Sequence, residues 1–220
     1  MLKDAYGWLD GLIGELQAEL GERVLFVGLQ GSYRRGEATE ESDIDVVTIL
    51  DKVDLPTLDA YRRLVRSMPQ GELACGFLCG REELLRWPRF DLLQMVLDTQ
   101  PRLGSWEDLL PGFMAEDTAE AVRVGASGLY HAGVHCWLYE QDRAAALREL
   151  AKSVFFLLRM EAYQKTGRYC INKKELEGCI SEEERPLLAL SRDPAGATAD
   201  LAQVERLYAQ LLPWSAGLMA

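Results

Sequence analysis

The sequence lacks several features that mark whole classes of protein. Its 220 residues contain five cysteines, an odd number with no Cys-x-x-Cys pair, which argues against a secreted disulfide framework or a zinc ribbon. No apolar run approaches the roughly 18 residues of a membrane span. The first residues carry Asp and Gly where a signal peptide would be uninterrupted and apolar. We therefore expect a soluble cytoplasmic protein with reduced thiols and no membrane partner.

Positive charge is also scarce. The chain has 24 basic and 35 acidic residues, a net charge of −11, and residues 1–110 carry −8 of it. Non-specific binding to DNA or RNA relies on a field of Lys and Arg, so we expect no nucleic-acid partner. The acidic balance instead favours small ligands that are cationic or metal-bound. Hydrophobic residues make up an ordinary 48%, which excludes disorder as the overall state and is enough for a sizeable core.

Helix and strand signals alternate in the first half of the chain. Apolar residues at helical spacing predict a helix over 4–20, and shorter helices are predicted over 56–68 and 81–87. Apolar or β-branched runs predict strands over 24–29, 43–50 and 72–78. The stretch 31–42 is predicted as a polar loop, and 91–99 fits a strand or a helix equally well.

Strand signals are absent after Pro111. Amphipathic stretches predict helices over 115–139 and 143–166, another that begins near Lys173, and two more over 181–192 and 199–213. The predicted fold class is therefore α+β. We expect a small mixed-sheet domain over 1–110 followed by an all-α helical bundle over 111–220.

One stretch combines a glycine-containing turn with two carboxylates. The strand over 24–29 leads into Gly31-Ser32, and ten residues later Asp43-Ile44-Asp45 opens the next strand. Residues two apart in a strand point to the same face, so the two Asp side chains project together, with Cβ atoms about 7 Å apart. Carboxylates held this close repel one another unless a cation compensates their charge.

Mg²⁺ suits this position because it takes oxygen ligands and commonly combines one or two carboxylates with nucleotide phosphates. Gly31 has no side chain to keep a phosphate away, and Ser32 offers both a hydroxyl and a backbone N–H. Arg34 and Arg35 follow closely enough to supply positive charge. These parts fit phosphoryl or nucleotidyl transfer, which depends on positioning and charge neutralisation.

The pattern Gly31-Ser32 followed by Asp43-Ile44-Asp45 resembles the signature of the polymerase-β nucleotidyltransferase superfamily. The strand LACGFL, the helix REELLRW and the later stretch KSVFFLLRMEAYQKTGRYCINKKELEG extend this likeness to aminoglycoside adenylyltransferases of the streptomycin/spectinomycin type. In that family an N-terminal nucleotidyltransferase domain is followed by a C-terminal helical domain. The resemblance thus implies that residues 1–110 form the nucleotidyltransferase domain.

The resemblance implies transfer of AMP from Mg²⁺-ATP to a hydroxyl of an aminoglycoside-like molecule. Asp43 and Asp45 would be the catalytic residues and would hold one or two Mg²⁺ ions. Lys173, with Lys174 beside it, best matches a lysine of the family's helical domain that contacts the phosphates. From the residues alone, these lysines are equally well explained as a charged helix end. The nucleotide-binding residues implied are Gly31, Ser32, Arg35, Ser42 and Lys173.

One group of the family pattern is missing from its usual place. The family carries a third carboxylate on the third strand, as a metal ligand or as the base for the acceptor hydroxyl, and that position falls on Cys75. A thiolate prefers softer metals than Mg²⁺. The nearby carboxylates are Glu72, Asp91 and Asp98, and Asp98 fits either a strand end or a solvated cap. The sequence therefore leaves the general base open, together with the nucleotide base preference and the oligomeric state.

Two other functions remain compatible with the same residues. The chain could be an antitoxin-like or regulatory protein that modifies or binds a protein partner. It could also bind a nucleotide without turnover, which the missing third carboxylate favours. No Arg is followed by a His after four to six intervening residues, since Arg123 and His131 are too far apart, so a fused ribonuclease is not expected.

Overall fold

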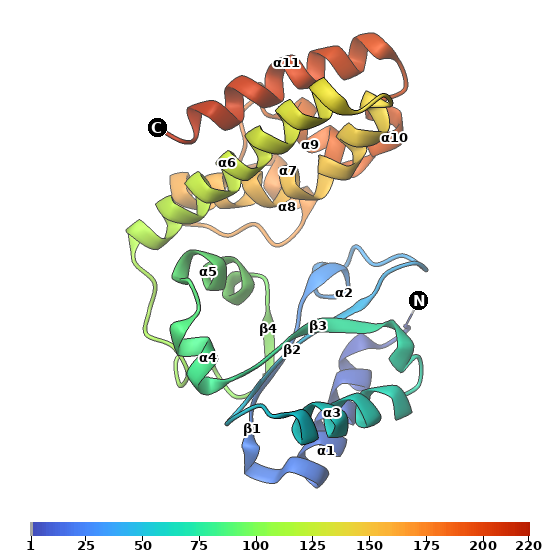
Figure 1. The fold of residues 1–220 in the computed structure, drawn as a ribbon, viewed down its shortest axis with the longest axis vertical. Helices are drawn as coiled ribbons and strands as arrows, with labels where there is room; N and C mark the ends of the chain where they lie inside the picture. The colour runs from blue at the N-terminus through green and yellow to red at the C-terminus, as the bar shows by residue number, and fades with distance from the viewer. Residues whose placement is uncertain (1) are drawn as a thin grey trace. The chain divides into compact units, whose positions relative to one another are not determined.

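We describe residues 2–220 from a computed structural model. The chain divides into two compact units, one that ends at Phe113 and one over Met114–Ala220. Figure 1 shows the first built around a sheet and the second built from helices. The predicted α+β class is confirmed. Among residues 2–220, no helix combines the length and apolar content needed to cross a membrane.

The first unit alternates helices and strands. Its helices and strands are, in chain order, α1 (Ala5–Leu20), β1 (Val24–Leu29), α2 (Gly31–Arg35), β2 (Ile44–Leu50), α3 (Leu55–Ser67), β3 (Ala74–Gly80), α4 (Arg81–Arg86), α5 (Arg89–Leu97) and β4 (Gln100–Leu103). Short 3₁₀ turns at Gly21–Arg23 and Gly71–Leu73 precede β1 and β3.

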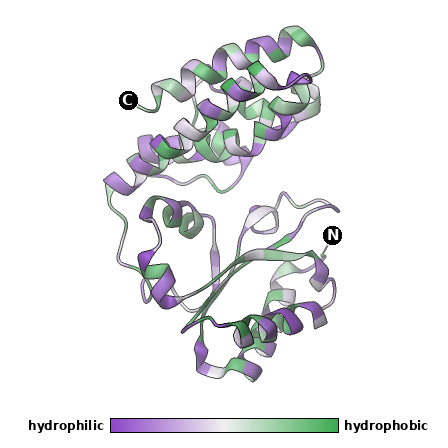
Figure 2. Cartoon of the chain, viewed as in Figure 1, coloured by the Kyte–Doolittle hydropathy of each residue, from purple (hydrophilic) through white to green (hydrophobic). Residues whose placement is uncertain are grey.

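The four strands form one mixed sheet in the order β3-β2-β1-β4. β2 runs antiparallel to β1 and parallel to β3, and β4 pairs antiparallel with β1. The central strands are mostly hydrophobic, whereas α3 is largely hydrophilic (Figure 2). This contrast follows from burial, because β1 and β2 are covered on both faces while α3 has one face in solvent.

Alternation along β2 decides which side chains reach which face. Ile44 and Val46 join a core formed with buried residues of α1. Val47 and Ile49 join a second core with buried residues of α4 and α5. Asp45 lies between Ile44 and Val46, so its side chain shares the face of Val47. The sheet therefore buries one set of residues under α1 and presents Asp45 on the opposite face.

The second unit is a helical bundle, as predicted. Its helices are α6 (Ala115–Tyr139), α7 (Arg143–Thr166), α8 (Lys173–Glu177), α9 (Arg185–Arg192), α10 (Pro194–Ala197) and α11 (Leu201–Gly217). α6 packs along α7, and α11 lies against α6. A Cβ at Gly133 of α6 would come within 2.9 Å of a Leu211 methyl group, so a glycine here allows α6 and α11 to approach closely.

Four elements differ from the prediction or complete it. The predicted loop over 31–42 begins with the one-turn helix α2, and the ambiguous segment 91–99 is mostly helix α5. β4 was not predicted, because it is a four-residue edge strand that contains Pro101. α11 continues through Pro213 to Gly217, whereas the predicted helix ended at 213.

Candidate active site

The turn between β1 and β2 brings the glycine and the carboxylates together. Hydrogen bonding closes this turn, because the Gln30 N–H donates to the Asp45 carbonyl oxygen over 2.8 Å. The Glu37 N–H donates to the Ser32 carbonyl oxygen over 2.9 Å and completes the α2 turn. Gly31-Ser32 therefore lies directly beside the start of β2 (Figure 1).

Gly31 is required here for two reasons. Its φ of 72° lies in the left-handed region, which side-chain-bearing residues rarely adopt. A Cβ at this position would also collide with the carboxylate of Asp45. The glycine thus leaves room for the Asp45 side chain as well as for a ligand, a role that its sequence context alone did not indicate.

The two carboxylates differ in environment. Asp43 is exposed and makes no hydrogen bond or ion pair with any of residues 2–220, whereas Asp45 is half-buried. Ile44 between them is fully buried and anchors the strand. No cluster of three or more His, Cys, Asp or Glu side chains in the described chain is arranged to hold a metal. Two carboxylates, one on β2 and one just before it, still fit Mg²⁺, which takes its remaining ligands from water and phosphate oxygens.

The two serines of the motif occupy different settings. The half-buried Ser32 side chain has no hydrogen-bond partner among residues 2–220, so its hydroxyl is available to a ligand. The Ser42 hydroxyl accepts a hydrogen bond from the Thr39 N–H over 2.8 Å. Ser42 therefore helps to fix the conformation of the loop that leads to Asp43.

Cys75 lies beside Asp45. The parallel register pairs these two residues, so the exposed thiol and the carboxylate share one face of the sheet. Of the other nearby carboxylates, Glu72 is exposed in the turn before β3. Asp91 accepts a hydrogen bond from the Trp87 indole N–H over 2.6 Å.

Asp98 contacts both arginines that follow the motif. Its side chain is only 3% exposed, and Arg35 Nη1 donates to Oδ2 over 2.9 Å. Arg34 Nη1 lies 3.6 Å from Oδ1, and Arg35 Nε donates to Glu37 over 3.3 Å. The guanidinium of Arg35 therefore bridges two carboxylates. Sequence reasoning missed this pairing, because Arg35 and Asp98 are 63 residues apart.

Lys173 belongs to the second unit, where it is the first residue of α8. Its Nζ lies 5.6 Å from the centre of the Phe155 ring, and its carbonyl oxygen accepts a hydrogen bond from Arg192 over 2.8 Å. The neighbouring basic residue Lys165 contacts the buried carboxylates Glu161 and Glu184.

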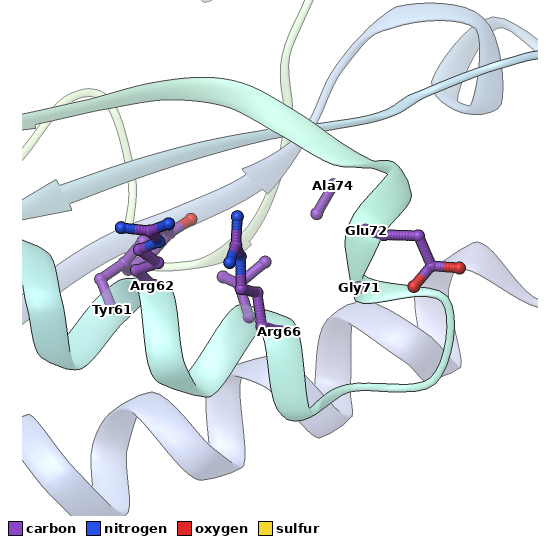
Figure 3. Close-up of a pocket in the computed structure, with 7 residues that line it drawn as sticks. Tyr61, Arg62, Arg66, Gly71, Glu72 and Ala74 are labelled. Carbon is purple, nitrogen blue, oxygen red and sulfur yellow. The ribbon is translucent and has the colours of Figure 1, made fainter.

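A cavity of about 560 Å³ lies on the other face of the sheet. Figure 3 shows Arg62 and Arg66 extending from α3 toward β3, with Glu72 on the adjoining turn. Ala74 in its lining pairs with Ile44, whose side chain faces away from Asp45. This cavity is therefore separate from the face that carries Asp45.

A family of known proteins matches most of the first unit. Residues 9–102 match the nucleotidyltransferase domain family, which confirms the superfamily resemblance carried by Gly31-Ser32 and Asp43-Ile44-Asp45. A Methanocaldococcus jannaschii protein, named as a candidate protein adenylyltransferase, is 44% identical over 43 residues. That stretch is 20% of this chain and 43% of the relative, so the match spans less than half of the relative's length.

A solved structure extends the likeness to both units. The spectinomycin adenyltransferase AAD(9) of Enterococcus faecalis, solved with ATP and spectinomycin, matches with a TM-score of 0.60. The match covers 94% of this chain and 99% of that structure, at 14% sequence identity. Identity this low concerns the fold, and it confirms the predicted likeness to the architecture of aminoglycoside adenylyltransferases.

Proposed function

We propose that this chain, which carries a nucleotidyltransferase domain over residues 9–102, transfers AMP from ATP to a hydroxyl of a small molecule. One observation carries the proposal: the carboxylate of Asp45 on β2 lies directly beside the Gly31-Ser32 turn, and Asp43 stands two residues earlier, just before the strand begins. Two carboxylates next to an open turn suit a nucleotide whose phosphates carry a metal ion.

Each motif residue has a role in this proposal. Asp43 and Asp45 would hold Mg²⁺, which when bound neutralises charge on the phosphates. The free hydroxyl of Ser32 and the backbone at Gly31 bind the triphosphate, while Ser42 keeps the loop before Asp43 in shape. In the reaction the acceptor oxygen bonds to the α-phosphorus, and the bond from that phosphorus to the leaving pyrophosphate breaks.

The acceptor is proposed to be a small, aminoglycoside-like molecule with several hydroxyls and amines. The fold shared with a spectinomycin adenyltransferase supports this class of acceptor. The −8 charge of residues 1–110 supports a cationic one, because an acidic surface attracts ammonium groups.

A protein acceptor is the second candidate. It is favoured by the relative from M. jannaschii, whose name describes protein adenylylation and whose 44% identity is the higher of the two. In that case the accepting hydroxyl would belong to a Ser, Thr or Tyr side chain.

One experiment separates these candidates. The purified chain is incubated with Mg²⁺ and α-³²P-labelled ATP, CTP, GTP or UTP, first with a panel of aminoglycosides and lincosamides and then with cell extract. Label from ATP on a small molecule is the expected result. Label on a protein would favour the second candidate, and bound nucleotide without any labelled product would contradict transferase activity.

A further inference from the structure

A buried carboxylate stands next to the proposed nucleotide site. Asp98 follows the last residue of α5, and its N–H donates to the Gln94 carbonyl oxygen over 2.9 Å. Two residues later, Gln100 opens β4 and pairs with Leu29 of β1. Leu29 in turn lies two residues before Gly31. The pairing of β1 with β4 therefore brings the α5–β4 junction beside the turn that carries Gly31 and Ser32.

The turn needs such support because α2 is short. Five residues form little more than one helical turn, and an isolated helix of that length is not stable in water. Arg34 and Arg35 are its last two residues, each with a side chain only 10% exposed. Asp98 contacts both, so a single carboxylate connects α2 to the end of α5.

These contacts assign the arginines and Asp98 a structural task. The guanidinium of Arg35 is shared between Asp98 and Glu37, and that of Arg34 is directed at Asp98. The hydrogen bond from Arg35 to Asp98 joins two charged groups and is therefore strong and well oriented, whereas Arg34 Nη1, 3.6 Å from Asp98, adds charge attraction without a hydrogen bond.

We propose that Asp98 is a positioning residue for the nucleotide, acting through Arg34 and Arg35 on the Gly31–Arg35 turn. It keeps the Ser32 hydroxyl and the Gly31 backbone at the place where the triphosphate binds. In this role Arg35 holds the turn in place through its ion pairs with Asp98 and Glu37. The inference rests on the proposed function, since it concerns the same nucleotide site.

The test measures binding of Mg²⁺-ATP by calorimetry, together with KM for ATP, kcat and thermal stability. Asp98→Asn keeps the side-chain shape and removes its charge. We expect binding of ATP to weaken about tenfold, because small displacements of positioning groups have effects of this size or larger. kcat at saturating ATP should change less than about threefold, since the reacting groups are intact. Asp91→Asn is the matched control, an exposed carboxylate on the same helix, and should bind ATP like the wild type.

A double substitution tests the route of the effect. If Asp98 acts through Arg35, then Arg35→Gln should weaken ATP binding in the same way, and the double variant should be no worse than either single one. If Asp98→Asn does not fold, Arg35→Gln carries the test by itself, because Arg34 still faces Asp98 in that variant.

The possible failures are distinguishable. Wild-type affinity for ATP in folded Asp98→Asn, with only the thermal stability lowered, would overturn the positioning role. Additive effects of the two substitutions would also overturn it. Absence of ATP binding in the wild-type chain and in Asp91→Asn would instead overturn the proposed function itself.

Discussion

Each unit of the chain buries carboxylates that pair with basic side chains, and the two clusters differ in what surrounds them. In the first unit, Asp98 holds Arg34 and Arg35 beside the Gly31-Ser32 turn. In the second, Lys165 Nζ lies 2.6 Å from Glu161 and 3.1 Å from Glu184. Both clusters contain carboxylates that are nearly inaccessible to solvent.

The cluster of the second unit is complete in itself. The Trp214 indole N–H donates to Glu161 over 2.9 Å, and the Ser181 N–H donates to Glu184 over 2.7 Å. In the first unit, the cluster adjoins groups with spare capacity: the exposed Asp43 and the free hydroxyl of Ser32. Buried charge therefore does not identify a site by itself. The candidate site is marked by the polar groups beside the buried charge that have no partner among the described residues.

The largest expected effect comes from the motif carboxylates. Asp43→Asn or Asp45→Asn should lower nucleotidyl transfer by about a hundredfold or more, because each removes a charge that would hold the metal. Asp43→Asn should leave the fold intact, since Asp43 is exposed and unpaired within the described chain. Glu161→Gln makes the same chemical change in the other cluster and should retain transfer. Initial rates and circular dichroism of the three variants check this, and wild-type rates in both Asp variants would refute the site.

A smaller effect is expected from the glycine turn. Gly31→Ala forces a positive φ and a collision with Asp45, so it should lower the free energy of unfolding by about 1–3 kcal/mol and also impair transfer. Gly36→Ala is the matched control, because its φ of 69° imposes a similar backbone strain while a Cβ there meets nothing within 4 Å. Chemical denaturation and initial rates separate the two effects. Equal losses of activity in both variants would show that the contact with Asp45 is unimportant.

The cluster of Glu161, Lys165 and Glu184 should make the stability of the protein depend on pH. Burial disfavours ionisation of Glu184, but hydrogen bonds from Ser181 and contact with Lys165 outweigh it and hold its pKa below 4.5. Burial raises the pKa of Glu161, and Lys165 offsets this only in part. A carboxylate whose pKa is lowered by folding stabilises the folded state above its ordinary pKa, and this stabilisation is lost as the pH falls. A carboxylate whose pKa is raised by folding stabilises the folded state at low pH instead.

Thermal unfolding from about pH 6 to pH 3.5 tests these signs. Glu184→Gln should flatten the loss of stability on acidification relative to the wild type. Glu161→Gln should make this loss of stability steeper. Glu161 takes up a proton more readily in the folded state, and the substitution removes that contribution. Identical pH profiles for the two variants would contradict the assigned directions.

The smallest effect is expected at Cys75. Its thiol is exposed beside Asp45, whereas burial and the neighbouring Cys179 raise the pKa of Cys170 to about 12. A disulfide reagent such as dithionitrobenzoate should therefore modify Cys75 well before Cys170. Cys75→Ser should change transfer by no more than about twofold, because a thiol is a poor ligand for Mg²⁺. Peptide mapping and initial rates check both points, and a large loss on Cys75→Ser would assign the thiol a part in catalysis.

Several features followed from local sequence, because local periodicity determines them. Helical spacing in α1 and the β-branched run of β2 produced elements close to those predicted. Asp45 lies on β2 as predicted, whereas Asp43, predicted as the first residue of the strand, lies just before it. The resemblance to nucleotidyltransferases could be recognised from the sequence because its motif residues lie in one continuous stretch.

Other features depended on contacts between distant segments. The edge strand β4 has too few residues and too little hydrophobicity to be recognised by pattern, and only its pairing with β1 makes it a strand. The collision that restricts position 31 to glycine involves Asp45 across a turn. The ion pair of Arg35 with Asp98 joins residues that only the sheet brings together.

The sequence by itself determined the pattern from which the nucleotide site is proposed, because those residues lie within one turn and the start of one strand. The tertiary structure decided how they are supported, since packing of β4 beside β1 delivers Asp98 to the two arginines. It also decided that Arg35 meets carboxylates, a placement that no local spacing could indicate. Pairing between distant strands depends on how the whole sheet packs around its core. Periodicity in the sequence, in contrast, indicates only which residues are neighbours along the chain.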